Sequence, residues 1–200
     1  MDVTAELFRR HGYTGTGMKQ VVTDAAAPFG SLYHHFPGGK EQLGSEVVER
    51  AGRMYLELFE AIMDAAPDVI TGVEWFFTGA AETLRQTDYV DACPIETVAL
   101  EVSSTSEVLR RACHEVFESW IAAATARFTD AGIDAETARG AAIAALSLLE
   151  GAFVFDRAGR CTEALEVGGR TAAEVVRQAL INGDRQRTTS GRGRARPRRR

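Results

Sequence analysis

Apolar residues recur along most of this chain at steps of three and four residues, the spacing that places them on one face of an α-helix. The longest such pattern begins at Lys40 and ends before Pro67. Further segments with this spacing cover residues 68–87, 94–103, 106–131, 135–157 and 161–181. The strict alternation of apolar and polar residues that predicts strands is absent. The pattern therefore predicts an all-α protein.

The first 39 residues contain three shorter helical patterns. The first is expected to end at His11-Gly12, because glycine commonly stops a helix, and Thr16 is expected to cap the second. The third is expected to run from about Pro28 to His34 and to be broken by Pro37-Gly38-Gly39. Three short helices with a tight turn between the second and third are typical of a helix-turn-helix. Residues 1–39 are therefore predicted to form a DNA-binding domain.

Charge is distributed unevenly along the chain. It has 23 basic and 28 acidic residues, and residues 183–200 hold eight arginines against one acid. Residues 1–182 therefore carry a formal charge of −12. An acidic body repels DNA overall, so any DNA contact must be local. The arginine-rich segment lacks apolar periodicity, and we expect it to be a disordered tail.

The sequence offers no pattern typical of a catalytic or metal site. Cys93, Cys113 and Cys161 are far apart and form no Cys-x-x-Cys pair or Cys/His cluster, so reduced thiols are the simplest interpretation. There is also no glycine-rich phosphate loop after a strand and no Ser/Cys-His-Asp arrangement. We therefore expect no enzyme, no metal and no cofactor.

Membrane and export signals are not evident either. No apolar run approaches the roughly 18 residues that span a bilayer. The best candidate, residues 141–155, is interrupted by Ser147, Glu150 and Gly151. Residues 1–15 lack a signal-peptide core. A cytoplasmic protein that does not enter membranes is expected.

Several residues of the N-terminal segment together resemble a known family signature. They are Thr16, Val21, Ala25, Gly30, Ser31, the run Leu32-Tyr33-His34-His35-Phe36, and Lys40. This set resembles the N-terminal region of TetR-type transcriptional repressors. Three stretches resemble the LmrA/YxaF-like branch in particular. They are Pro28-x-Gly30-Ser31, Phe36-Pro-Gly-Gly-Lys40, and Cys93-Pro94-Ile95 followed by Ala99-Leu100-Glu101. The resemblance implies a homodimeric repressor that a small-molecule effector releases from a palindromic double-stranded DNA operator.

By this resemblance, the third short helix would be the recognition helix. Leu32 and Phe36 would anchor it, leaving its other face for the DNA groove. Gly30 would allow a close approach to DNA, and the hydroxyls of Ser31 and Tyr33 can bond phosphates or bases. The residues expected at the DNA are Thr16, Lys19, Pro28, Phe29, Gly30, Ser31, Tyr33, His34 and Lys40.

Structural roles remain as alternatives for some of these residues. Thr16 and Lys40, at the starts of two helices, would hold phosphates by resemblance. Thr16 could instead be only a helix cap, and Lys40 only a solvated charge. Tyr33 and the neighbouring His35 could be packing residues of the small core.

The sequence departs from the family pattern in three places. Ala26-Ala27 occupies the tight turn where the family usually has glycine, and a positive φ would strain an alanine there. Phe29 stands where polar or basic residues are common; it could meet the DNA or pack against a neighbour. The chain also starts inside the first helix, without the family's basic N-terminal arm, which would weaken binding unless the true start lies upstream.

The last two long helices are the expected dimer surface. Small residues line one face of each helix and would allow two such helices per subunit to pack closely. The residues expected at this interface are Ala141, Ala145, Leu149, Ala152, Ala172 and Val176. The alternative is that these faces close the core of the monomer.

The resemblance also implies an effector pocket within the helical body. The candidate ligand-binding residues are Tyr55, Phe59, Trp75, Phe76, Glu96, Phe117, Trp120 and Phe153. Each aromatic residue could equally be ordinary core. Carboxylates in otherwise apolar helices, at Glu96, Glu101 and Glu150, favour a cationic or hydroxyl-bearing effector if they are buried, and exposure to solvent is the other possibility.

These observations divide the chain into residues 1–39 for DNA binding, 40–182 for regulation and dimerisation, and the tail 183–200. The pocket would be coupled to the recognition helices through the long helix that starts at Lys40. The competing interpretation is a helical small-molecule-binding or scaffold protein with a DNA-binding unit that no longer functions.

Overall fold

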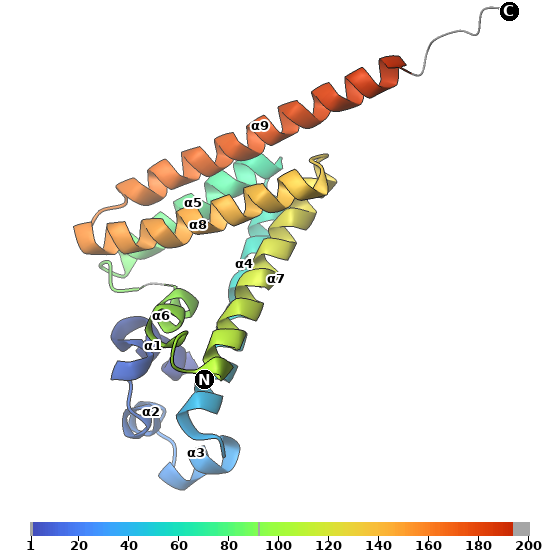
Figure 1. The fold of residues 1–200 in the computed structure, drawn as a ribbon. Coiled ribbons are helices and arrows are strands. Elements are labelled where there is room, and N and C mark those ends of the chain that lie inside the picture. Colours follow the sequence, from blue (N-terminus) through green and yellow to red (C-terminus); the bar gives the residue numbers. More distant parts are fainter. Residues whose placement is uncertain (1, 92, 194–200) are drawn as a thin grey trace, which may run out of the picture.

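The computed structural model describes residues 2–91 and 93–193, apart from the side chains of residues 2, 29, 31, 33, 184 and 186–193. Nine helices and no strands occur in this part of the chain, as the sequence pattern predicts. They are α1 (Asp2–Gly15), α2 (Met18–Asp24), α3 (Phe29–His35), α4 (Gly39–Ala65), α5 (Val69–Gln86), α6 (Pro94–Val102), α7 (Glu107–Asp130), α8 (Ala135–Gly159) and α9 (Glu163–Gly193). Helices α1–α3 lie at one end of an elongated molecule and α8–α9 at the other (Figure 1).

Glycine interrupts α1 where the sequence predicts a stop. Gly12 has φ 72° and ψ 170°, and helical structure resumes before the element ends at Gly15. A Cβ at Gly12 would lie only 1.8 Å from Oε1 of Glu101 on α6. Gly12 is therefore needed both for its backbone conformation and for the close approach of α6.

The turn between α2 and α3 has the geometry that sequence analysis identified as strained. Ala26 has φ 48°, in the left-handed region. Its N–H bonds to the Thr23 carbonyl at 3.1 Å, and the Ala27 N–H bonds to the Val22 carbonyl at 3.0 Å. This pair of bonds is the Schellman motif, which usually has glycine at the position of Ala26.

One hydrophobic core, called the lower core, joins the three N-terminal helices to α6 and to the first halves of α4 and α7. Phe8, Val22 and Leu32 pack in the same cluster as Val47 of α4 and Ile95 of α6. Helix α1 packs more extensively against α6 than against α4. The boundary expected after residue 39 therefore falls inside a continuous hydrophobic core.

A second core fills the upper half, where α5, α7, α8 and α9 pack together. Asp156, fully buried near the end of α8, accepts the N–H groups of Ala164 and Leu165 at 2.9 and 2.8 Å and so fixes the start of α9. The small-residue faces predicted to form the dimer surface lie in or beside this core. Ala141, Leu149, Ala152, Ala172 and Val176 are all buried within the monomer, and Ala145 is half-buried against the cluster.

The predicted dimer residues are thus core residues, and other faces of α8 and α9 are exposed. Large apolar side chains on these faces are uncovered in the single chain, with Phe155 73% exposed. The others are Ile143, Val154, Val167, Val175 and Ile181. Among the described residues, only α8 is long and apolar enough to span a membrane by length and composition. It packs against α7 and α9, but its apolar character extends to the uncovered face, and only 28% of the apolar stretch is buried.

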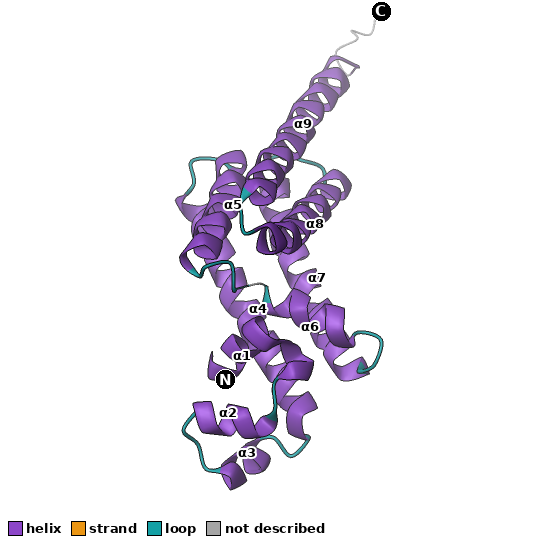
Figure 2. Cartoon of the chain, turned by 90° about the vertical axis from the view of Figure 1, so that its left-hand side faces the viewer, coloured by secondary structure: helices purple, strands orange, loops and turns teal. Residues whose placement is uncertain are grey.

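The arginine-rich segment differs from the predicted disorder over part of its length. Helix α9 continues to Gly193, well beyond residue 183 (Figure 2). Arginine and glutamine are good helix formers, and no proline interrupts α9 before Pro197, so a helix already started can propagate through this segment. Residues 194–200 of the predicted tail lie outside the described residues.

Candidate DNA-binding surface and effector cavity

Helices α2 and α3 present an exposed surface at the end of the molecule. Lys19, Pro28, Gly30 and His34, all predicted at the DNA, are exposed there. Nothing lies within 4 Å of a Cβ built at Gly30, so the backbone of α3 is open to a close neighbour at this point. The side chains of Phe29, Ser31 and Tyr33 lie outside the described residues, although their backbone is helical.

The inner side of α3 is anchored as predicted. Leu32 is buried, at 9% exposure, and belongs to the lower core, with Phe36 packed against it. His35 is exposed, so it is not a packing residue of the small core. Its ring lies 5.4 Å from that of His34.

Thr16 does not have the predicted position. It is fully buried, and its hydroxyl donates to the Gly12 carbonyl at 2.7 Å, while Gly17 is the residue that precedes α2. The hydroxyl satisfies a carbonyl that the break in α1 leaves without a helical partner. The prediction that Thr16 caps α2 is therefore wrong, and in this conformation its side chain is not available to a phosphate.

The Lys40 ammonium lies against the end of α1. It lies 4.4 Å from the Tyr13 ring centroid and 3.4 Å from the Thr14 carbonyl oxygen, to which it donates. Partial burial lowers the pKa of Lys40, and the nearby Glu101 carboxylate opposes this shift. In this conformation Lys40 ties α4 to the end of α1 and is neither a phosphate contact nor a freely solvated charge.

The same segment of α1 is also held by α6. Oε2 of Glu101 accepts the Thr14 N–H at 2.7 Å. The backbone of Thr14 thus binds the carboxylate of α6 through its N–H and the ammonium of α4 through its carbonyl, in two successive peptide groups. Cys93, at the opposite end of α6, lines a cavity, so this short helix connects the cavity to the break in α1.

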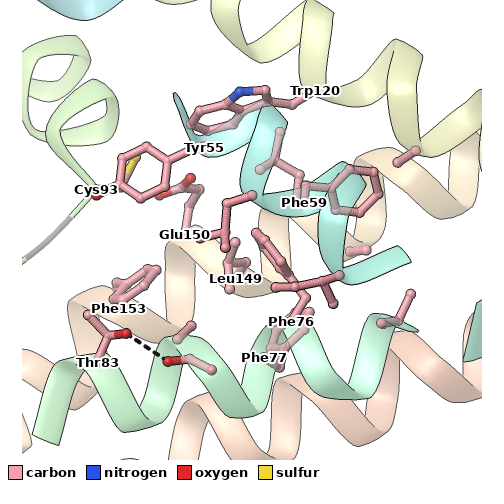
Figure 3. Close-up of a pocket in the computed structure, with 18 of the residues that line it drawn as sticks. Tyr55, Phe59, Phe76, Phe77, Thr83, Cys93, Trp120, Leu149, Glu150 and Phe153 are labelled. Carbon is pink, nitrogen blue, oxygen red and sulfur yellow. Dashed lines mark hydrogen bonds between the residues drawn. The ribbon is translucent and has the colours of Figure 1, made fainter. Parts of the chain in front are cut away.

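The cavity lies among α4, α5, α7 and α8 and has a volume of about 300 Å³. Its wall is predominantly aromatic and aliphatic (Figure 3). Phe59 and Phe76 meet edge to face with centroids 5.5 Å apart, and Tyr55 meets Trp120 similarly at 6.2 Å. The Trp120 ring N–H donates to the Gly52 carbonyl at 2.9 Å, which fixes the indole against α4.

Five predicted ligand-binding residues lie in this wall, and three do not. Those in the wall are Tyr55, Phe59, Phe76, Trp120 and Phe153. Trp75 is 47% exposed because it lies on the outer side of α5. Phe117 packs against Trp120 from the lower core and does not reach the cavity. Glu96 lies behind the wall, close enough to raise the pKa of Glu150.

Glu150 is one of three acidic or basic residues in the cavity wall, together with Arg9 and Asp91. Its Oε2 is buried and has no hydrogen-bond partner. Burial raises the pKa of Glu150 to about 8, the neighbouring Glu96 carboxylate adds to this shift, and the Cys93 thiol opposes it. Burial likewise raises the pKa of Glu96 to about 7, against the attraction of Arg157. Figure 3 shows the Glu150 side chain between Tyr55, Cys93 and Leu149.

Charged groups from other segments complete the wall. Arg9 of α1 lies 3.8 Å from Asp91, measured from Nε to Oδ2, and both residues line the cavity. Burial raises the pKa of Tyr55, while a hydrogen bond with Arg9 lowers it. Sequence analysis missed Arg9, Asp91 and Cys93 as wall residues because they lie outside the long helices. Glu150 could be recognised in the sequence, because it is a carboxylate in an otherwise apolar helix.

Comparison with known proteins agrees with this geometry. Residues 1–52 match the model of bacterial regulatory proteins of the tetR family, and residues 69–171 match the model of the C-terminal domain of LmrA/YxaF-like transcriptional regulators. The chain is 32% identical over 151 residues to the HTH-type transcriptional regulator LmrA of Bacillus subtilis, which spans 76% of this chain and 80% of that protein. It is 33% identical over 151 residues to the uncharacterized regulator YxaF of the same organism, covering 76% and 79% respectively.

Solved structures share the fold. Regulatory protein TetR from Rhodobacter sphaeroides superimposes with a TM-score of 0.78 at 21% identity, over 87% of this chain and 95% of that one. A TetR transcriptional regulator from Legionella pneumophila gives 0.77 at 20% identity, over 86% and 92%. The matches to both family models and the identity to LmrA place the chain in the TetR family of bacterial transcriptional regulators, in the group that resembles LmrA and YxaF.

Proposed function

We propose that this regulator is a homodimeric repressor that binds a palindromic operator through α3 and is released by a small molecule in the cavity. Such a protein acts in the cytoplasm, where the chromosome lies. The observation that supports this most directly is the pairing of an exposed α2–α3 surface with an aromatic cavity in one chain, connected by α6. Relatives that are transcriptional regulators support the same assignment.

The dimer would form through the uncovered apolar faces of α8 and α9. Phe155, Val154 and Val167 are exposed there in the single chain. A Cβ built at Gly140 or Gly151 of α8 meets nothing within 4 Å, so small residues on this helix leave room for a partner helix. Burying these side chains between two subunits would supply the hydrophobic free energy that obligate dimers use.

Operator binding would depend on α3 and on the two lysines of the chain. Lys19 is exposed on α2, and Lys40 would reach a phosphate only by leaving the Tyr13 ring. A body with a formal charge of −12 over residues 1–182 repels DNA, so the affinity must come from this small surface. Specific binding with a steep salt dependence is therefore expected.

The test is titration of a labelled fragment of the protein's own promoter region, read as fluorescence anisotropy at several salt concentrations. Wild type should bind at least about 10³-fold tighter than it binds random DNA. Gly30→Asp, which has room for its side chain, should weaken operator binding at least about tenfold by placing a carboxylate near phosphates. Ala122→Asp, on an exposed position of α7, is the matched control and should leave binding unchanged. Equal affinity for promoter and random DNA would favour the scaffold interpretation.

A further inference from the structure

The buried Glu150 carboxyl lacks the partner that its charged form needs. Its Oε2 is inaccessible and receives no hydrogen bond. The charged group that affects it most is another acid, Glu96, and no cation contributes to its pKa shift. A buried carboxylate with no cation and only a thiol as donor is costly, so such a group usually serves a ligand or remains protonated.

Two arginines lie in or just behind this wall. Each has other contacts, although its Nε is buried without a hydrogen-bond partner. Arg9 lies against Asp91 at 3.8 Å and hydrogen-bonds Tyr55. Arg157 donates to the Val90 carbonyl at 3.3 Å and its charge acts on Glu96. The cavity wall and the residues just behind it therefore contain three acidic groups and two basic ones, and Glu150 carries a negative charge there only once it loses its proton.

Aromatic rings surround the rest of the cavity. The negative faces of aromatic rings attract cations, most strongly where water is excluded. Tyr55 and Trp120 lie on the Glu150 side of the cavity, and Phe59 and Phe76 lie farther along it (Figure 3). A volume of about 300 Å³ suits a small organic molecule of two or three rings.

We propose that the effector of this regulator is a lipophilic organic cation whose positive centre lies against the Glu150 carboxylate, with its apolar part among the aromatic rings. This inference rests on the proposed function, because it concerns the ligand of the same cavity. Glu150 is the specificity-determining residue, and Glu96 increases the local negative charge from behind the wall.

The affinity of an uncharged ligand would change with pH in a different direction from that of a cation. Because the pKa of Glu150 is about 8, the free protein holds a proton there at pH 7. A cation binds the ionised form, so its affinity rises with pH up to about 8 and then levels off. A neutral ligand that accepts a hydrogen bond from the protonated carboxyl loses affinity over the same range. The sign of the pH dependence therefore distinguishes the two.

Thioflavin T, a permanent cation that fluoresces when held rigidly, is the probe. Its control is the uncharged benzothiazole that lacks the ring N-methyl group. Both would be titrated into the full-length protein without DNA, by fluorescence and calorimetry. We expect the affinity for thioflavin T to rise at least about tenfold between about pH 6.5 and about pH 8.5, with one proton released per cation bound below the pKa. The uncharged analogue should bind more weakly and show no such rise.

Two variants locate the effect. Glu150→Gln keeps the shape and removes the charge, so it should reduce thioflavin T affinity at least about tenfold at pH 8.5 and leave only the smaller pH dependence that Glu96, with a pKa of about 7, contributes. Glu115→Gln makes the same change on the exposed side of α7 and should have no effect. Ala145→Phe narrows the cavity and should weaken both probes if they bind there.

Absence of thioflavin T binding at every pH, or equal binding by Glu150→Gln, overturns the inference. Promoter binding is measured separately. If wild type binds its promoter specifically but not the cation, only the effector class is wrong. If it binds the cation but no specific DNA, the proposed repressor function is wrong and the cation site stands.

Discussion

Replacing Ala26 with glycine should stabilise the protein, although it removes a methyl group. Ala26 occupies the left-handed position of the Schellman motif that ends α2. Its side chain is exposed, so the methyl group contributes little packing. The turn that this residue forms sets the angle between α2 and α3, and therefore affects the DNA-binding surface as well as stability.

The magnitude follows from two opposing terms. The left-handed conformation costs an L-residue about 1–2 kcal/mol relative to glycine. Glycine loses more backbone freedom on folding than alanine does, and this loss lowers the stability of the variant by about 0.5–1 kcal/mol. The net expectation for Ala26→Gly is a gain of about 0.5–1 kcal/mol. For a chain of about 200 residues this raises the midpoint of thermal unfolding by about 1–4 °C.

Ala27→Gly is the matched control. It changes the same side chain one residue later, at a position without a positive φ, so only the entropic cost of glycine remains. Urea unfolding and calorimetry of the two variants and wild type, at equal protein concentration, measure the difference. If Ala26→Gly is no more stable than Ala27→Gly, the strain assigned to this turn does not exist.

Three further predictions concern packing, assembly and coupling. Gly52→Ala should lower the free energy of unfolding by about 1–3 kcal/mol, because its Cβ would lie 2.5 Å from a Val116 methyl. Gly79→Ala, where a Cβ meets nothing within 4 Å, should be neutral or stabilising, and urea titration compares the two variants. Phe155→Glu should convert the dimer to a monomer in light scattering, and an unchanged mass would exclude the exposed α8 face as the interface. Glu101→Ala should lower the free energy of unfolding by about 1 kcal/mol and weaken effector-induced DNA release, because it removes the acceptor of the Thr14 N–H. DNA release equal to that of wild type would show that α6 does not transmit the signal.

The order of the helices and most of their bounds, apart from the end of α9, could be predicted from sequence because they depend on local features. Asp68, Ser106 and Asp134 each accept an N–H of the first turn of α5, α7 and α8, close to the starts that periodicity predicts. Glycine at position 12 and the strained turn at Ala26 were also visible in the sequence. Such features involve residues no more than five positions apart.

The errors arose where a residue's partner is distant in sequence. Periodicity identified apolar faces on α8 and α9, but small residues occur around much of both helices, and it did not show which face meets the monomer's own core. The pairing of Arg9 with Asp91 and the contact of Glu101 with Gly12 likewise join segments more than 80 residues apart. A single sequence contains no signal for either.

These distant contacts change the expected route of regulation. Sequence analysis expects coupling through α4. In the structure α1 packs mainly against α6, and the backbone of Thr14 is held by Glu101 of α6 together with Lys40 of α4. A ligand that displaces Cys93 at the start of α6 would act on the Glu101 end of the same rigid helix, nine residues long. Loss of the Glu101 hydrogen bond would leave that of Lys40 to the Thr14 carbonyl. Because Lys40 would then compete between Thr14 and a DNA phosphate, the effector and the operator would act on one junction, which gives a physical basis for their opposing effects.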